Sequence, residues 1–279
     1  SHRAVIEQSV RVNVEADSLN CALLLPGEGP DAPAFGALVR EVVREMTIKS
    51  GQKCTAIRRI LVPEPLYDAA AQSIAAKLAS VTVGNPRNDK VRMGSLVSRA
   101  QFDAVRSGIA QLRTQTEALY DGSAAPLVDA DRAVAACIGP TLLGTRSPDA
   151  ADAVHRIEVF GPVCTLMPYR DLPHAYALAR RAEGSLVTSL YGSDPQALAS
   201  ATCALADAHG RVHVVTPAVA DTHTGHGNVM PQSQHGGPGR AGGGEELGGL
   251  RALLFYHRRV AVQADTAVLD AISAAPFVL

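Results

Sequence analysis

One cysteine carries the strongest chemical signal in the sequence. Cys54 stands in the run KSGQKCT at 49–55, directly after a predicted helix and directly before a predicted strand. A loop between two such elements leaves a thiol accessible while the scaffold fixes its direction. Two lysines of this run and the downstream Arg58 and Arg59 are expected to make the surroundings electropositive, which favours thiolate over thiol. These residue types fit a nucleophile, although the spacing alone leaves open a buried, inert thiol.

The other cysteines have a different setting. They lie among apolar or small neighbours and are expected to be buried; they are Cys21, Cys137, Cys164 and Cys203. The sequence has no CxxC pair, so neither a disulfide framework nor a zinc knuckle is predicted. Reduced thiols and an N-terminus without a secretory h-region predict a cytoplasmic protein.

The stretch 218–249 is rich in Gly, His and Pro and is predicted to be a loop. Its histidines, His223, His226 and His235, include an HxxH spacing, but no neighbouring carboxylate or cysteine completes a metal shell. We therefore predict solvated histidines and no metal site. Residues 237–242 match GxGxxG, yet no strand pattern precedes them, so a dinucleotide fingerprint is not predicted.

Charge and hydropathy exclude several classes of partner. The 26 Lys and Arg residues against 27 Asp and Glu residues give a net charge of −1, without the basic excess of nucleic-acid binders. No apolar run approaches the roughly 20 residues that a membrane span requires. We expect neither a nucleic-acid nor a membrane partner. The length of 279 residues suits one large domain or two modest ones.

Segments with strand and helix patterns alternate along the chain. Strands are predicted at 11–15, 21–25, 56–62, 81–83, 137–143, 163–167, 186–191, 211–216 and 258–263. Helices are predicted between 31 and 50, at 66–79, around 102–112, at 172–183 and at 195–208. In the first helix Asp31 is the expected cap, and Arg40, Glu41, Arg44 and Glu45 form the expected solvent face. This alternation predicts an α/β fold with a largely parallel sheet.

Four segments, in chain order, carry a resemblance to a known family. They are RVNVEADSLN at 11–20, REMTIKSGQKCTAIRRILVP at 44–63, IEVFGPV at 157–163 and HGGPGRAGGGEELGGLRALLFYHRRVAVQ at 235–263. The sequence resembles the aldehyde dehydrogenase superfamily, and within it the acyl-CoA semialdehyde dehydrogenases of aerobic aromatic catabolism. The resemblance covers essentially the whole chain, and GQxC followed later by ExFGPV is a specific combination within it.

The resemblance implies roles for particular residues. Cys54 would be the nucleophile, Glu15 the general base, Glu158 the group that holds the nicotinamide ribose, and Phe160 a neighbour of the ring. The family's FGG and following Gly/Glu pattern correspond to His235, Gly236, Gly237, Gly242, Gly244, Glu246 and Gly248. A thiolate would form a thiohemiacetal, hydride would pass to the cofactor, and an activated water would hydrolyse the resulting thioester.

The resemblance also implies a domain organisation. It predicts a three-layer αβα catalytic domain at 21–225, with 226–279 as an active-site loop, a returning helix and an oligomerisation strand. Residues 1–20 would end a Rossmann-like cofactor domain that this chain lacks, so we expect the chain alone to be nearly inactive. The parent enzyme would oxidise a CoA-linked semialdehyde with NADP, or alternatively NAD, as a homo-oligomer formed through the C-terminal strand.

Two other functions remain open at this point. A cysteine-dependent acyl-CoA hydrolase or transferase would pair Cys54 with a histidine and would not depend on Glu15. An oligomerisation fragment without activity would use its C-terminal strand to pair with a partner sheet.

Overall fold

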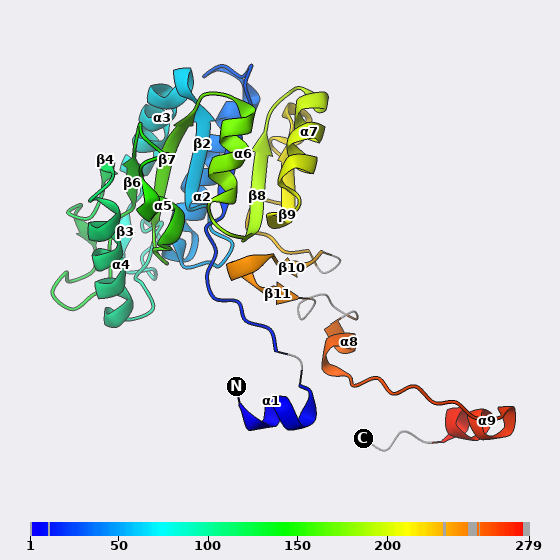
Figure 1. The fold of residues 1–279 in the computed structure, drawn as a ribbon. Helices are drawn as coiled ribbons and strands as arrows, with labels where there is room; N and C mark the ends of the chain where they lie inside the picture. Colours follow the sequence, from blue (N-terminus) through cyan, green and yellow to red (C-terminus); the bar gives the residue numbers. More distant parts are fainter. Residues whose placement is uncertain (1, 11, 231–232, 245–249, 251, 276–279) are drawn as a thin grey trace.

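A seven-stranded sheet forms the centre of the protein. The computed structural model describes residues 2–10, 12–230, 233–244, 250 and 252–275 (Figure 1). The strands are β1 (Cys21–Leu24), β2 (Arg59–Pro63), β4 (Glu117–Asp121), β6 (Thr141–Gly144), β7 (Val163–Tyr169), β8 (Ser185–Tyr191) and β9 (His209–Val215). Their order is β4-β6-β7-β2-β1-β8-β9, and every pair is parallel except β4–β6. The predicted, largely parallel sheet is confirmed.

Helices cover both faces of the sheet (Figure 1). One face packs against α2 (Pro33–Thr47) and α3 (Tyr67–Ala79). The other packs against α4 (Arg99–Leu112), α5 (Asp152–Arg156), α6 (Leu172–Arg180) and α7 (Pro195–Leu205). Successive strand residues point to opposite faces, so Ala22 and Leu24 join one core while Cys21 and Leu23 join the other. The three predicted αβα layers are therefore present.

Shorter elements complete the fold. They are η1 (Ile48–Gly51), η2 (Glu64–Leu66), β3 (Val83–Gly84), β5 (Leu127–Val128), η3 (Pro217–Val219), β10 (His235–Gly236), η4 (Gly239–Ala241), β11 (Gly243–Gly244), α1 (Arg3–Gln8), α8 (Ala252–Tyr256) and α9 (Thr266–Ala274). The helices α1, α8 and α9 lie away from the sheet (Figure 1). Among the helices that the structure describes, none has the length and apolar character needed to cross a bilayer.

Two predicted strands are not strands in the structure. Residues 12–20 have no regular secondary structure, and neither do 258–265. The valines that suggested alternation, among them Val12, Val14, Val260 and Val262, are exposed. A strand needs a ladder of backbone hydrogen bonds to a neighbour. Segment 12–20 makes only isolated backbone hydrogen bonds, such as those of Ala16 and Asp17 to Arg240, and none of the described strands pairs with 258–263.

The first long helix differs from its prediction in two respects. Its N-cap is Ala32 and not Asp31, although Pro33 does open the helix. The expected solvent face is also wrong in part, because Glu41 and Glu45 are buried. The loop that carries His226 covers Glu41, whose carboxylate accepts the His226 backbone N–H at 2.6 Å. A contact between residues so distant in the chain leaves no trace in helical periodicity.

Candidate active site

The predicted site residues gather at one edge of the sheet. Glu15 precedes β1, Cys54 precedes β2, and Glu158 and Phe160 precede β7. These three strands are neighbours in the order β7-β2-β1 and are parallel. The residues that lead into parallel neighbours necessarily reach the same edge, here the amino edge. Open α/β sheets usually bind ligands at the opposite, carboxyl edge.

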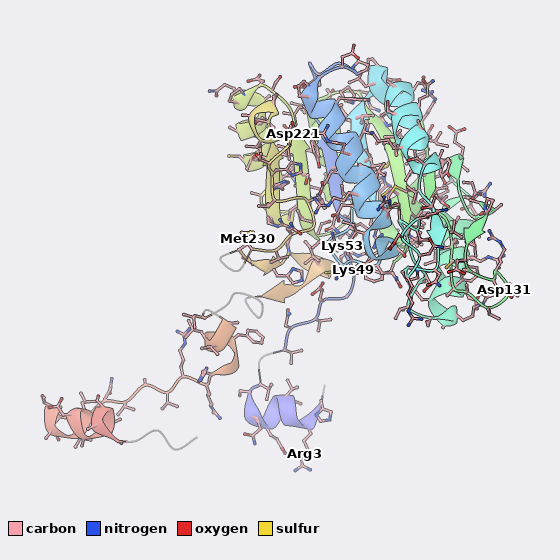
Figure 2. All side chains as sticks on the ribbon, turned by 180° about the vertical axis from the view of Figure 1, so that it is seen from behind. Arg3, Lys49, Lys53, Asp131, Asp221 and Met230 are labelled. Carbon is pink, nitrogen blue, oxygen red and sulfur yellow. The ribbon has the colours of Figure 1, made fainter. Side chains whose placement is uncertain are left out.

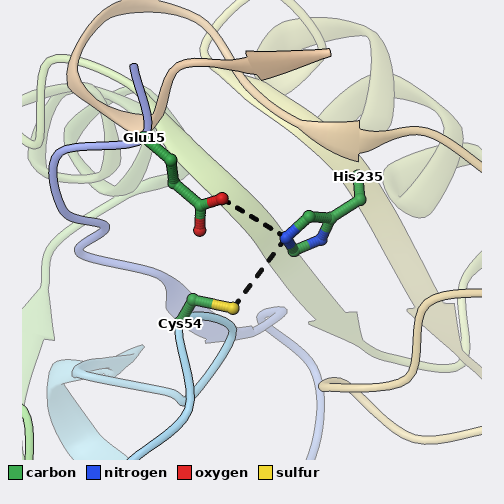
Figure 3. Close-up of side chains that lie close together, drawn as sticks. All are labelled: Glu15, Cys54 and His235. Atoms are coloured by element: carbon green, nitrogen blue, oxygen red, sulfur yellow. Dashed lines mark hydrogen bonds and ion pairs between the residues drawn. The ribbon is translucent and has the colours of Figure 1, made fainter. Parts of the chain in front are cut away.

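Three side chains from separate segments meet at this edge (Figure 3). The Sγ of Cys54 lies 3.9 Å from Nε2 of His235, and a carboxylate oxygen of Glu15 lies 3.5 Å from the same nitrogen. The thiol is half-buried, His235 is buried, and the Glu15 side chain is 29% exposed. The structure therefore brings together the predicted nucleophile and base, and it adds a histidine between them.

A buried amide positions the Cys54 loop. The Asn20 side chain, fully buried, donates to the carbonyl oxygens of Cys54 and Ala56 at 2.8 and 2.9 Å. Its Oδ1 accepts from the hydroxyl of Ser18 and from the backbone N–H of Val187. Asn20 thus ties the loop to β1 and β8. Asn20 was not among the predicted site residues, and its place one residue before a buried strand was the available signal.

The Gly-rich hairpin positions Glu15. The backbone N–H groups of Ala16 and Asp17 donate to the carbonyl oxygen of Arg240, and the Arg240 guanidinium forms an ion pair with the Asp17 carboxylate. Gly242 has φ +53°, and a Cβ there would lie 1.7 Å from a backbone oxygen of the same N-terminal segment. Only glycine allows this close approach. The GxGxxG match at 237–242 lies between β10 and β11 and leads directly into a strand, whereas a dinucleotide fingerprint opens directly into an α-helix.

The surroundings of Cys54 are not electropositive as predicted. The Lys53 ammonium is bound to the Glu45 carboxylate at 2.6 Å, and Arg58 is paired with Glu158. Lys49 lies with Lys53 at the end of α2, on the side facing the hairpin (Figure 2). Burial, together with the charge of Glu15, raises the pKa of the Cys54 thiol, against an opposing backbone hydrogen bond at Thr55. The thiol therefore needs a proton acceptor before it can attack.

Glu158 and Phe160 both contact the Arg58 guanidinium. The Glu158 carboxylate accepts from Nε of Arg58 at 3.2 Å and from the backbone N–H of Ser18 at 3.0 Å. Burial raises the pKa of Glu158, while the charge of Arg58 opposes the increase. Phe160 is 38% exposed, and the Arg58 guanidinium lies 5.4 Å from its ring centre. The predicted Glu246 and Gly248 lie outside the described residues.

The predictions for two histidines and for one cysteine are wrong. His226 and His235 are buried and not solvated, and burial lowers the pKa of His226 well below its usual range. Glu15 and Cys54 bring to His235 the carboxylate and the thiol that its neighbours in the sequence lack, so possible metal ligands do meet in the folded chain. Cys203 is exposed, whereas the other three predicted core cysteines are buried.

The size of a cavity does not identify this site. A cavity of about 570 Å³ lies along α4 and is lined by Arg99, Phe102, Arg106 and Arg132, among others. None of the three converging side chains lines it. The chemistry at the amino edge is recognised from side-chain geometry.

Relatives of known identity match most of the chain. The sequence is 52% identical over 239 residues to 3,4-dehydroadipyl-CoA semialdehyde dehydrogenase of Aromatoleum evansii, covering 85% of this chain and 46% of that protein. It is 44% identical over 180 residues to Protein MaoC of Klebsiella aerogenes, covering 64% of this chain and 52% of that protein. The chain therefore spans about half the length of these relatives.

Solved structures share the fold. An oxidoreductase from Marinobacter aquaeolei has a TM-score of 0.71 at 21% identity, covering 90% of this chain and 47% of its own. A betaine aldehyde dehydrogenase from Staphylococcus aureus, solved with NAD⁺, has a TM-score of 0.70 at 21% identity, covering 83% and 43%. A model of the aldehyde dehydrogenase family matches residues 29–261. The chain belongs to the aldehyde dehydrogenase family.

Proposed function

We propose that the chain carries the catalytic part of a dehydrogenase that oxidises a CoA-linked semialdehyde to its carboxylate in aromatic-compound degradation. The observation that carries the proposal is the meeting of Cys54 and Glu15 at the amino edge, beside His235. The name of the relative at 52% identity supports a CoA-linked semialdehyde as the substrate class.

The first step forms a covalent adduct at Cys54. The thiol proton passes to a neighbouring acceptor, for which the Glu15 carboxylate is within reach through His235. The sulfur then bonds to the aldehyde carbon, and the carbonyl π electrons move to the oxygen. The backbone N–H of Cys54 would stabilise the alkoxide as half of an oxyanion hole.

The last step releases the acid. Glu15 first releases the thiol proton to solvent, to which its side chain is exposed. Once the adduct has become a thioester, the Glu15 carboxylate takes a proton from water, the hydroxide bonds to the acyl carbon, and the C–S bond breaks. The released thiolate takes up a proton again because its environment raises the thiol pKa. The Glu15 side chain suits the role of base, since its partial exposure gives water access.

Glu158 and Phe160 would hold the nicotinamide cofactor, for which NADP is proposed from the resemblance and NAD is the alternative. The exposed ring of Phe160 offers an apolar face, and each Glu158 oxygen keeps a lone pair beyond its one hydrogen bond. When bound, the cofactor supplies the hydride acceptor. The same two residues lie beside Arg58, which holds the loop before Cys54.

An acyl ester tests the covalent chemistry without the redox step. With p-nitrophenyl acetate the chain should release about one p-nitrophenolate per molecule in a burst and then turn over slowly. Cys54→Ala should remove both phases. Glu15→Gln should keep the burst amplitude, reached more slowly because Glu15 accepts the thiol proton, and should slow turnover by roughly 10²-fold or more. A burst that survives Cys54→Ala would overturn the proposal. Oxidation itself is measured as NADPH formation from a CoA-linked semialdehyde, with Cys54→Ala as the control.

A cysteine-dependent acyl-CoA hydrolase is the second candidate. The observation that favours it is the 3.9 Å separation of the Cys54 sulfur from Nε2 of His235, since a histidine base is what such an enzyme needs. The two functions differ in their dependence on Glu15. Acyl-CoA hydrolysis that persists in Glu15→Gln and disappears in His235→Phe would favour the hydrolase.

Three further predictions belong to this proposal. The chain's division into the end of a cofactor domain at 1–20, a catalytic domain at 21–225 and a loop, helix and oligomerisation strand at 226–279 stays a prediction. A cytoplasmic location also stays a prediction. The extended segment 258–263 exposes Val260 and Val262, which suits pairing with a second subunit. Light scattering of Val260→Lys against the unmodified chain tests this assembly.

A further inference from the structure

The three converging side chains also form a set of metal ligands. One ligand atom each from Glu15, Cys54 and His235 lies within 4.8 Å of the other two. We propose that this site binds a zinc ion, with the Cys54 thiolate, Nε2 of His235 and the Glu15 carboxylate as its ligands. The site rests on these atoms and does not depend on which reaction the protein performs.

The separations suit tetrahedral zinc. Bonds of about 2.3 Å to sulfur and about 2.0 to 2.2 Å to nitrogen and oxygen place tetrahedral ligand atoms about 3.4 to 3.6 Å apart. The structure has 3.5 Å between the Glu15 oxygen and the His235 nitrogen, and 3.9 Å between that nitrogen and the Cys54 sulfur. The Glu15 oxygen and the Cys54 sulfur lie within 4.8 Å of each other, so side-chain rotations that move these atoms by about an ångström would close the site. Thiolate, imidazole and carboxylate are the ligand types that zinc takes in proteins.

Each ligand is held by a separate backbone anchor. The Cys54 carbonyl accepts the Asn20 amide, and His235 pairs with Gly244 in the β10–β11 hairpin. The Glu15 segment is tied to Arg240 by two backbone hydrogen bonds and by the ion pair with Asp17. Anchored ligands lose little freedom on binding, which favours a site of defined geometry.

The site has an entrance and a fourth position. The Glu15 side chain is 29% exposed and the thiol is half-buried, so an ion can enter from that side. Three protein ligands leave one tetrahedral position for water. Lys53, which precedes Cys54 in the sequence, is paired with the Glu45 carboxylate, so its positive charge is neutralised next to the site. Binding would convert the thiol to a thiolate and release one proton to solvent.

Occupation would prevent the proposed chemistry. The ion takes the sulfur lone pair that would attack a substrate and the carboxylate that would activate water. Zinc would therefore act as a reversible inhibitor that a chelator removes. The consequence applies equally to a dehydrogenase and to a hydrolase, because both use Cys54.

Cobalt is the probe for the site. The chain, reduced with a phosphine and freed of metal by chelator, is titrated with Co²⁺; a tetrahedral thiolate site gives a sulfur-to-cobalt charge-transfer band and intense visible bands. We expect one Co²⁺ per chain, displaced by one Zn²⁺. Cys54→Ala should abolish the charge-transfer band, and His235→Phe and Glu15→Gln should each weaken Zn²⁺ binding by at least about 10-fold. The control Cys203→Ala changes a cysteine outside the site and should bind as the unmodified chain does.

A second measurement needs no variant. Zn²⁺ should slow alkylation of Cys54 by iodoacetamide at least about 10-fold, as read from its peptide by mass spectrometry, without slowing that of Cys203. Equal protection of both cysteines, or a cobalt spectrum without a sulfur band, would overturn the site. Because neither readout requires turnover, loss of the metal site and failure of the proposed function are distinguishable.

Discussion

Replacing Glu158 by glutamine should destabilise the chain measurably, whatever its role toward a cofactor. The Glu158 and Arg58 side chains are only 8% and 4% exposed and form an ion pair at 3.2 Å. Glutamine keeps the shape and an acceptor for the Ser18 N–H but removes the negative charge. The Arg58 guanidinium then stays buried without a counter-ion.

The size of the expected loss of stability depends on the interactions that Arg58 retains after the substitution. Breaking a buried pair by removing one partner costs about 3–5 kcal/mol. Arg58 retains hydrogen bonds to the carbonyl oxygens of Gly51, Lys53 and Gly161, which hold part of its charge. Burial also raises the pKa of Glu158, so the substitution relieves some desolvation cost. We expect a net loss of about 2–3 kcal/mol in the free energy of unfolding.

Urea denaturation followed by far-UV circular dichroism measures this loss as a lower midpoint at unchanged slope. The matched control is Asp207→Asn, which breaks the ion pair with Arg180 on the surface, where the side chains are 71% and 44% exposed. An exposed pair of this kind contributes about 0 to 1 kcal/mol. Equal midpoints for the two variants would refute the reasoning. If Glu158→Gln also lowers activity, a displaced Cys54 loop has to be distinguished from lost cofactor binding, because Arg58 holds that loop.

Three further outcomes are expected. Burial, with a neighbouring guanidinium, lowers the pKa of His155 to about 4 from 6.5. The unfolded chain therefore binds this proton first, and stability should fall by at most about 3 kcal/mol as pH decreases from 6.5 to 4, with a shallower decline in urea titrations of His155→Gln. Gly242→Ala should push the Glu15 segment off the hairpin, seen as slower ester turnover with a retained burst. Iodoacetamide should label Cys54 and Cys203 in the native protein and the buried cysteines only in denaturant, as read by mass spectrometry.

The order of buried strands and helices could be predicted because it depends on local patterns. Each buried strand of the sheet centre appears as an apolar run, and each of the longer helices has its own punctuation. The short helix α5 and the edge strand β4 were not predicted. The error at Glu41 and Glu45 has a different origin, since the loop around His226 and the Lys53 side chain supply their partners. The sequence shows that Glu41 and Glu45 are polar, but it does not show whether their partners are water or groups of distant segments.

The candidate site could be predicted only in part for the same reason. Cys54 and Glu15 were identified through motifs that resemble a family, and the structure places them together. The position of His235 depends on a hairpin that returns from 181 residues beyond Cys54 and docks through Arg240. No local pattern encodes that distance. The predicted positive surroundings of Cys54 failed because the carboxylates that neutralise Lys53 and Arg58 come from other elements.

The amino edge of the sheet has an electrical polarity of its own. Helices α2, α6 and α7 each connect two parallel strands and run antiparallel to them, so their C-termini reach the edge where Cys54 lies. The aligned peptide dipoles place about half a negative charge at each such end. A cation at this edge is stabilised, whereas phosphate groups gain nothing from these helices. A phosphate group held within a turn of these helix ends would therefore have to be met by lysine or arginine side chains.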